Sequence, residues 1–376
     1  MRIGNCSGYY GDRASAAREL LDGGPLDVLT GDYLAEVTMY VLAKVRSRGR
    51  PGYAATFLGQ LEDVLGVALD RGVRIVTNAG GLEPARLAEE VERLAARLGL
   101  APSVAYLDGD DLLPRLGELR RDGVTLAHLD DPTRDLPGEP LTANAYLGGW
   151  GIVAALDAGA DVVVCPRVTD ASLVVGPAAW WFGWPRDAWD ALAGAVVAGH
   201  LVECGTQVTG GNYSFFREIP RRERLGFPVA EVAADGSCVV TKEPGSGGAV
   251  TVGTVTEQLL YEIGGPRYRN PDVVARFDTV TLHQAGADRV AVRGARGEPA
   301  PATLKVGCHY VAGHRNTATV LLTGLDIDDK AVDVERQLVD RLGDAAAAAR
   351  LRTELRRTDT PDATSQEGMT ARLVIT

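Results

Sequence analysis

The sequence lacks several features that would assign a protein to a class at once. Its five cysteines are scattered and include no CxxC pair, so neither a disulfide framework nor a zinc ribbon is indicated. No basic run is longer than a few residues and the net charge is −11, which argues against nucleic acid or an anionic membrane surface as partner. No apolar run reaches the length of a membrane span, and the first residues do not resemble a signal peptide. We therefore expect a cytoplasmic protein that binds a small molecule.

Signatures of common cofactors and nucleophiles are also missing. There is no GxGxxG motif for a dinucleotide, no lysine at P-loop spacing, and no HxH or HxxxH pair for a metal. The GxSxG turn that carries the nucleophile of many hydrolases is missing as well. We expect no organic cofactor and no metal, and an activity that survives exhaustive chelation.

What the sequence does contain is a repeated pattern in its first half. Hydrophobic residues make up 45% of the chain, enough for a large core. Short apolar runs predict strands at residues 2–6, 26–30, 73–77, 103–107 and 161–165, with amphipathic helices near 14–21, 34–46, 84–98 and 143–158. Because helices separate the strands, we predict an α/β fold with a mostly parallel, Rossmann-like sheet and flanking helices.

The pattern changes near residue 219 to short strands and turns, which predicts a smaller α+β domain. Thr254 and Glu257 have the spacing of a capping box, which predicts a helix near residues 255–263. Further elements are expected at 229–232, 238–242, 277–283, 289–293, 304–311, 317–322 and 330–342. The expected division is a domain of residues 1–218 with the active site, an α+β domain of 219–345, and a C-terminal helix, linker and strand of 346–376.

The most informative stretch is residues 161–172, DVVVCPRVTDAS. A β-branched apolar run is followed at once by Arg167, Thr169, Asp170 and Ser172. In open α/β sheets, ligands bind at the carboxyl ends of the strands. Arg167 and Asp170 could instead simply pair with each other while Ser172 caps the next helix. We favour a ligand site, because other predicted strands also end in polar or glycine-rich turns that hold Asp32, Tyr33, Asn78, Gly80 and Gly81.

Residues 199–213 form a second polar stretch after a helix that we expect to end at Gly199. A single histidine there would usually cap helix carbonyl groups. This stretch also contains further polar and reactive side chains, namely His200, Glu203, Cys204, Gln207, Asn212 and Tyr213. Glu36, in the first turn of an earlier helix, either compensates the helix dipole or acts as a base, and the sequence favours neither.

Several runs in this order resemble the acyclic terpene utilisation AtuA family. They are LTGDYLAEVTM, TNAGGL, ANAYLGGWGIVAALDAGADVVV, RVTDASLVVGPAAWW, AGHLVECGTQVTGGNYS and GTVTEQLLYEIG, and they cover most of the chain to about residue 325. Members of the family look like components of pathways that degrade branched acyl-coenzyme A thioesters. The resemblance implies an acyl-handling enzyme without naming its reaction.

Our first functional hypothesis is a cofactor-independent lyase of the hydratase or dehydratase type, acting on a branched carboxylate or acyl thioester. Such a reaction needs a base, an acid and donors for an enolate oxygen. The candidate catalytic residues are Glu36, Asp170, His200 and Glu203. The candidate substrate-binding residues are Asp32, Tyr33, Asn78, Gly80, Gly81, Asn144, Arg167, Thr169, Ser172, Gln207, Asn212 and Tyr213.

Two other hypotheses stay open at this point. One is a hydrolase of an acyl thioester or ester, with Cys204 or Ser172 as nucleophile and His200 as base. The other is a non-catalytic acyl-binding subunit. In each case we expect a homo-oligomer whose ligand is a small carboxylate or acyl thioester.

Overall fold

The computed structural model describes residues 1–134, 137–345 and 350–376. These divide by their contacts into a main unit, Met1–Tyr310, and a C-terminal unit, Val311–Thr376. The helices of the main unit are α1 (Ala16–Asp22), α2 (Glu36–Arg46), α3 (Thr56–Asp70), α4 (Pro84–Arg97), α5 (Leu116–Arg121), α6 (Trp150–Asp157), α7 (Ser172–Phe182), α8 (Trp189–Glu203) and α9 (Val252–Leu260).

A nine-stranded sheet with the order β11-β12-β8-β7-β1-β2-β3-β6-β4 forms the centre of the main unit. One half is parallel and contains β1 (Arg2–Asn5), β2 (Val28–Gly31), β3 (Arg74–Thr77), β6 (Val162–Val164) and β4 (Val104–Tyr106). The other half is antiparallel and contains β7 (Pro228–Val232), β8 (Cys238–Lys242), β12 (Arg289–Arg293) and β11 (Thr281–Gly286).

The prediction of an α/β fold is confirmed, but the sheet is mixed rather than mostly parallel. Strand β7 pairs antiparallel with β1, joining residues more than 220 positions apart. Local sequence patterns carry no information about such a pairing. Four of the strands expected in an α+β domain, β7, β8, β11 and β12, therefore extend the first sheet, and a separate smaller domain beginning at residue 219 is not confirmed.

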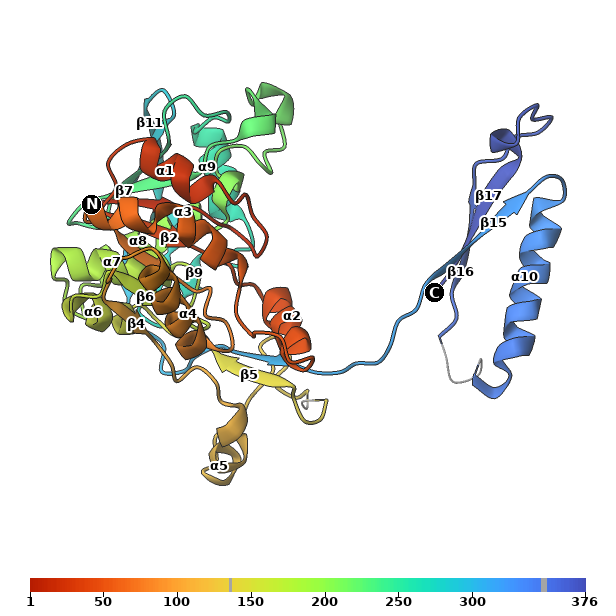
Figure 1. Ribbon diagram of the computed structural model, residues 1–376, viewed down its shortest axis with the longest axis horizontal. Coiled ribbons are helices and arrows are strands. Elements are labelled where there is room, and N and C mark those ends of the chain that lie inside the picture. Colours follow the sequence, from red (N-terminus) through yellow and green to blue (C-terminus); the bar gives the residue numbers. More distant parts are fainter. Residues whose placement is uncertain (135–136, 346–349) are drawn as a thin grey trace. The chain divides into compact units, whose positions relative to one another are not determined.

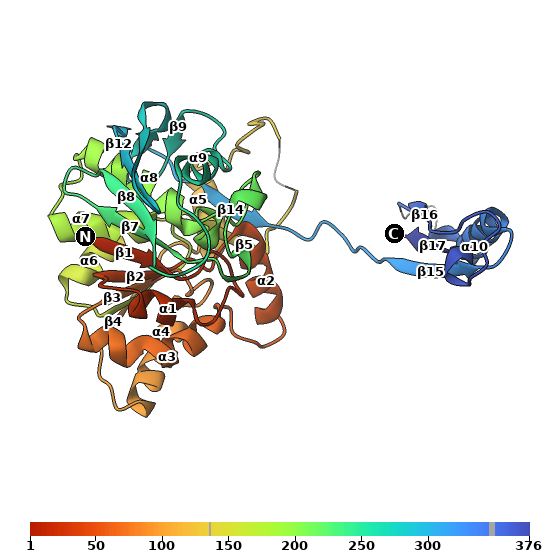
Figure 2. The same ribbon diagram turned by 90° about the horizontal axis from the view of Figure 1, so that it is seen from above.

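Helices cover both faces of the parallel strands (Figures 1 and 2). Val162 and Val164 of β6 pack on the side of α3 and α4, whereas Val163 packs on the side of α6, α7 and α8. A strand covered on both faces needs apolar residues at every position, which explains the unbroken valine run.

Helices α7 and α8 bring the chain away from the carboxyl ends of the parallel strands and back to them. A Cβ atom added to Gly199, near the end of α8, would lie 2.6 Å from the Cα of Ala171, at the start of α7. Gly199 therefore permits close helix packing and does not end the helix. Because α8 continues to Glu203, the prediction that it stops at Gly199 is wrong, and His200 and Glu203 lie in its last turn.

Two other local predictions are also corrected. Residues 143–158 were expected as one helix, but β5 (Thr142–Ala145) pairs with the distant β14 (Val306–His309) before α6 begins. The capping box of α9 is formed by Thr251 and Thr254, because Thr254 is the third helical residue and not the cap. The sequence patterns also did not reveal α3, and Ser172 is the first residue of α7 and not its cap.

A small sheet with the order β13-β10-β9 packs on α8, and it consists of β13 (Arg296–Glu298), β10 (Val274–Arg276) and β9 (Arg267–Arg269).

In the C-terminal unit, α10 (Ile327–Leu342) packs on a sheet of β15 (Ala318–Thr323), β17 (Thr370–Ile375) and β16 (Thr353–Arg357). Short 3-10 turns are η1 (Leu113–Arg115), η2 (Gly205–Gln207), η3 (Phe216–Glu218), η4 (Arg222–Arg224), η5 (Phe277–Thr279) and η6 (Glu367–Met369). Among the described residues, no helix has both the length and the apolar character that crossing a bilayer requires.

Asp272 is a buried carboxyl group beside the start of α6. Its side chain accepts a hydrogen bond from the N–H of Gly149 at 2.8 Å, and the residue is only 3% exposed. Burial raises the pKa of Asp272 from 3.8 to about 6. Between these pH values the folded protein holds a proton that the unfolded chain releases, so stability falls as the pH rises through this window.

We therefore expect Asp272→Asn to raise the free energy of unfolding at pH 8 by up to about 3 kcal/mol and to change this free energy little near pH 4. The amide oxygen can still accept the hydrogen bond from Gly149, and no buried charge remains. Thermal or denaturant unfolding at the two pH values measures the difference. An equal change in the free energy of unfolding at both pH values would show that titration of the Asp272 carboxyl group does not cause the pH dependence.

Candidate functional site

Polar side chains follow β2 and β3 at the carboxyl edge of the parallel strands. Asp32 comes directly after β2, and Asn78 directly after β3. Asn78 donates through Nδ2 to Asp32 Oδ1 at 2.6 Å, and its Oδ1 accepts from the N–H of Tyr33 at 2.7 Å. The Tyr33 contact fixes the orientation of the amide, so Asn78 holds the Asp32 carboxyl group in place.

Arg167 follows β6 at the same edge and is only 2% exposed. Its Nη1 donates to Asp170 Oδ1 at 2.6 Å, and its guanidinium lies over the ring of Tyr146, 4.1 Å from the centroid. Its Nε has no hydrogen-bond partner among the described residues. A guanidinium stays charged at every relevant pH, so the site contains a buried cation with a spare donor.

His200 and Glu203 form a buried pair in the last turn of α8. His200 Nε2 lies 2.9 Å from the carbonyl oxygen of Gln258, which can only accept, so Nε2 carries the hydrogen. His200 Nδ1 then faces Glu203 Oε1 at 3.1 Å. Burial lowers the pKa of His200, while burial, Asp170 and Glu262 raise the pKa of Glu203. Both shifts favour a neutral pair, in which Glu203 donates its proton to Nδ1.

The end of α8 is tied to the end of β1. Asn5 Nδ2 donates to the carbonyl oxygens of Val202 at 2.7 Å and Glu203 at 3.1 Å.

The pKa of Asp32 is raised by burial, by Asp170 and, to a smaller degree, by Glu203, while Asn78 and Arg167 lower it. These groups therefore act on one another electrostatically. We call Asp32, Asp170, Glu203 and Glu262 the carboxyl cluster.

Glu36 lies beside this cluster in a different network. Tyr146 donates its hydroxyl hydrogen to Glu36 Oε1 at 2.6 Å, and Lys305 Nζ lies 3.0 Å from the same oxygen. Burial alone would raise the pKa of Glu36, but these hydrogen bonds outweigh it and lower the pKa to about 2. A carboxylate this acidic is a poor base near neutral pH.

The Gly80–Gly81 turn was expected to offer N–H groups to an anion. The N–H of Gly80 donates to Cys165 O at 3.1 Å and that of Gly81 to Asn78 O at 3.2 Å. Both hydrogens are therefore engaged within the fold. A Cβ atom on Gly80 would lie 2.5 Å from Cys165 O, so this glycine allows the turn after β3 to approach the end of β6.

Gly80→Ala should therefore destabilise the protein by about 1–3 kcal/mol, because a backbone atom must move to admit the methyl group. Gly59→Ala is the matched control, since Gly59 lies inside α3 with no atom near the added Cβ. That change should stabilise the helix by roughly 1 kcal/mol. Denaturant unfolding of both variants tests the difference in sign. Equal changes in stability in the two variants would show that Gly80 has no special packing role.

The remaining predicted site residues are held mainly by local contacts. Thr169 and Ser172 share a hydrogen bond of 2.5 Å, and Asn144 donates to Asp110 Oδ2 at 2.7 Å. The ring of Tyr33 packs in the core beside Phe57. Beyond α8, Asn212 bonds to Gln207 at 3.0 Å, and the hydroxyl of Tyr213 lies against Gly253 of α9.

Comparison with known protein families matches residues 1–376 to one family, described as acyclic terpene utilisation family protein AtuA. The chain belongs to the AtuA family. The resemblance read from the sequence is thus confirmed, and the match includes the residues beyond 325. No curated protein and no solved structure matches the chain.

The structure of this AtuA-family protein adds residues that the sequence patterns did not indicate. Glu262 comes from the turn after α9 and lies with His200 and Glu203. Arg167 and Lys305 both lie over the ring of Tyr146, with Lys305 Nζ 4.5 Å from its centroid. These side chains come from segments far apart in the chain, so no local spacing could have indicated them. The aromatic character of Tyr146 was the one available signal.

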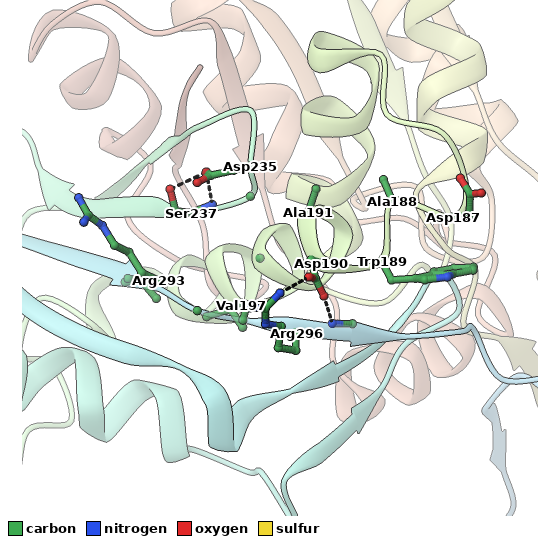
Figure 3. Close-up of a pocket in the computed structure, with 16 residues that line it drawn as sticks. Asp187, Ala188, Trp189, Asp190, Ala191, Val197, Asp235, Ser237, Arg293 and Arg296 are labelled. Atoms are coloured by element: carbon green, nitrogen blue, oxygen red, sulfur yellow. Dashed lines mark hydrogen bonds and ion pairs between the residues drawn. The ribbon is translucent and has the colours of Figure 1, made fainter.

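A pocket of about 720 Å³ lies elsewhere in the protein (Figure 3). It is lined by the start of α8 and by residues before β8 and after β12, which places it at the edge where the parallel strands begin. Two of its three acids are already bonded: Asp190 to the N–H of Gly297 and to Arg296, and Asp235 to Ser237. These bonds lower the pKa of both acids. Because such fixed carboxylates are poor proton donors, we place the candidate active site at the carboxyl cluster.

Proposed function

We propose that this AtuA-family protein is a lyase of the hydratase or dehydratase type that acts on a branched carboxylate or acyl thioester. The observation that supports this most is the placement of two differently held acids beside a buried guanidinium. Asp170 is paired with Arg167, whereas Glu203 is buried against His200 with a raised pKa. Pairs of acids in different environments are typical of acid–base catalysis.

In this proposal Arg167 binds the substrate carboxylate or thioester carbonyl oxygen. Its spare donor supports this, and hydrogen bonds from a charged donor are about twice as strong as neutral ones. As negative charge develops on that oxygen, the guanidinium would stabilise it more strongly. Tyr146, lying against the guanidinium plane, keeps its orientation.

Dehydration then needs two proton transfers. Asp170 takes the proton from the carbon next to the carbonyl, and the electrons of that C–H bond form the carbon–carbon double bond. Glu203 gives its proton to the departing hydroxyl group, and the C–O bond breaks to release water. Hydration is the same path reversed. His200 does not contact the substrate in this scheme, but its Nδ1 positions the Glu203 proton.

The hydrolase alternative has less support. Burial, and to a smaller degree Glu203, raise the pKa of Cys204, so the reactive thiolate is disfavoured. His200 directs its two nitrogens to Glu203 and Gln258, and the hydroxyl of Ser172 bonds to Thr169. No base is thus aligned with either nucleophile among the described contacts.

The test is an assay of branched 3-hydroxyacyl and 2-enoyl substrates, as free acids and as coenzyme A thioesters. Mass spectrometry would follow the loss or gain of one water. We expect interconversion with at least one acyl type. Release of free coenzyme A without dehydration would favour the hydrolase, and binding without conversion would favour an acyl-binding subunit.

A further inference from the structure

Three potential metal ligands converge at the end of α8. One atom each from His200, Glu203 and Glu262 lie within 4.8 Å of one another. His200 and Glu203 are buried, whereas Glu262 is exposed at the turn after α9. The group therefore has a closed side within the protein and an open side toward solvent.

The geometry of His200 suits a ligand. Its Nε2 hydrogen is directed to the Gln258 carbonyl oxygen, which leaves the lone pair of Nδ1 directed at Glu203. A second partner of this kind usually fixes the tautomer of a metal-binding histidine. Two ligands about 2.1 Å from one ion lie roughly 3.0 to 3.4 Å apart at octahedral or tetrahedral angles. The observed distance of 3.1 Å between Nδ1 and Oε1 falls within this range.

Glu203 also has an oxygen without a partner. Its Oε2 is buried and has no hydrogen-bond partner among the residues described, although Glu203 is only 5% exposed. Polar atoms this deeply buried normally have a partner, and one without calls for an explanation such as an ion. No hydrogen-bond donor for Oε2 lies within reach among the residues that the structure describes, whereas a cation would satisfy it.

The charge balance points in the same direction. The carboxyl cluster contains four acids, of which Asp170 pairs with Arg167, while no arginine or lysine in the described part of the chain forms an ion pair with Glu203 or Glu262. A cation bound between these carboxylates would offset their negative charges at close range.

We propose that His200, Glu203 and Glu262 form a binding site for one divalent transition-metal ion, of the Mn²⁺ or Zn²⁺ class. One imidazole with two carboxylates fits these ions better than it fits Ca²⁺, which prefers six to eight oxygen ligands. Three protein ligands leave a coordination position open, as in catalytic sites. In the ion-bound form, the ion and not the Glu203 proton would assist departure of the hydroxyl group. That last point rests on the proposed function, but ion binding itself does not.

The test measures binding of Mn²⁺ and Zn²⁺ to the full chain after dialysis against a chelator. Calorimetry gives the stoichiometry, and electron paramagnetic resonance reports bound Mn²⁺ directly. We expect one saturable site per chain, its loss in Glu203→Gln, and a roughly tenfold or greater rise in Kd in Glu262→Gln. Glu92→Gln, which alters an exposed acid of α4, is the control and should bind as the wild type does.

Two results would overturn the site: no saturable binding up to millimolar ion, or binding unchanged in both Glu203→Gln and Glu262→Gln. If Glu203→Gln fails to fold, the exposed Glu262→Gln variant still decides. Ion binding without any water addition or elimination would support the site and count against the proposed function. Water addition or elimination without ion binding would support the proposed function and count against the metal site.

Discussion

Replacing Glu203 with glutamine should lower turnover by roughly 10²- to 10⁴-fold, the usual contribution of a positioned acid or base. Glutamine has nearly the same shape and can still bond to His200 through its amide. It cannot give up a proton to a leaving hydroxyl group. The loss should appear in kcat more than in KM, because the proton is transferred only in the transition state.

Glu243→Gln is the matched control for this change. Glu243 is also a buried glutamate, its pKa is also raised by burial, and its Oε2 also has no partner among the described residues. It contacts the region of α1 and is not part of the carboxyl cluster. Steady-state kinetics should show near-normal turnover in Glu243→Gln. Equal losses in the two variants would mean that a buried glutamate matters for the fold and not for the reaction.

Arg167→Lys should weaken binding of an acidic substrate or product by roughly 2 to 4 kcal/mol, which is about thirtyfold to several-hundredfold in Kd. Lysine keeps the charge that pairs with Asp170. It cannot reproduce the planar fork that matches a carboxylate and stacks on Tyr146. We expect only a small change in Tm, because the charge and the aliphatic part of the side chain remain.

Arg13→Lys provides the corresponding control. Arg13 also lies over an aromatic ring, 4.9 Å from the Phe227 centroid, also pairs with an acid, and also has an Nε without a partner. Calorimetric titration and a thermal melt would be made on both variants. Arg13→Lys should bind normally. An Arg167→Lys variant that melts early and binds normally would show that Arg167 serves the fold alone.

Much of the parallel half of the sheet could be predicted from the sequence, because each of its strands is a short apolar run before a turn. Arg167 and Asp170 were predictable for the same reason, since they directly follow the valine run of β6. The antiparallel half could not be predicted as part of this sheet. Its attachment depends on the pairing of β7 with β1, whose residues are distant in sequence and individually ordinary.

The candidate site was predictable only where its residues follow strands. His200 and Glu203 were expected in a loop, because Gly199 resembles a helix end. The structure shows that Gly199 is required by the close approach of α7, a contact that leaves no local sequence signal. The meeting of Glu262 with these two residues depends on the turn after α9, where Glu262 adopts a φ of 52°. A positive φ at glutamate is uncommon and cannot be anticipated from its sequence neighbours.

Exchange of hydrogen at the carbon next to the carbonyl tests most directly whether the carboxyl cluster abstracts a proton. A branched acyl thioester that binds the protein would be incubated with it in D₂O, and deuterium at that carbon would be followed by NMR. We expect exchange with the wild-type protein and its loss in Asp170→Asn, with ligand affinity measured in parallel. A ligand that binds with normal affinity and shows no exchange, or the same exchange in Asp170→Asn, would contradict proton abstraction by Asp170.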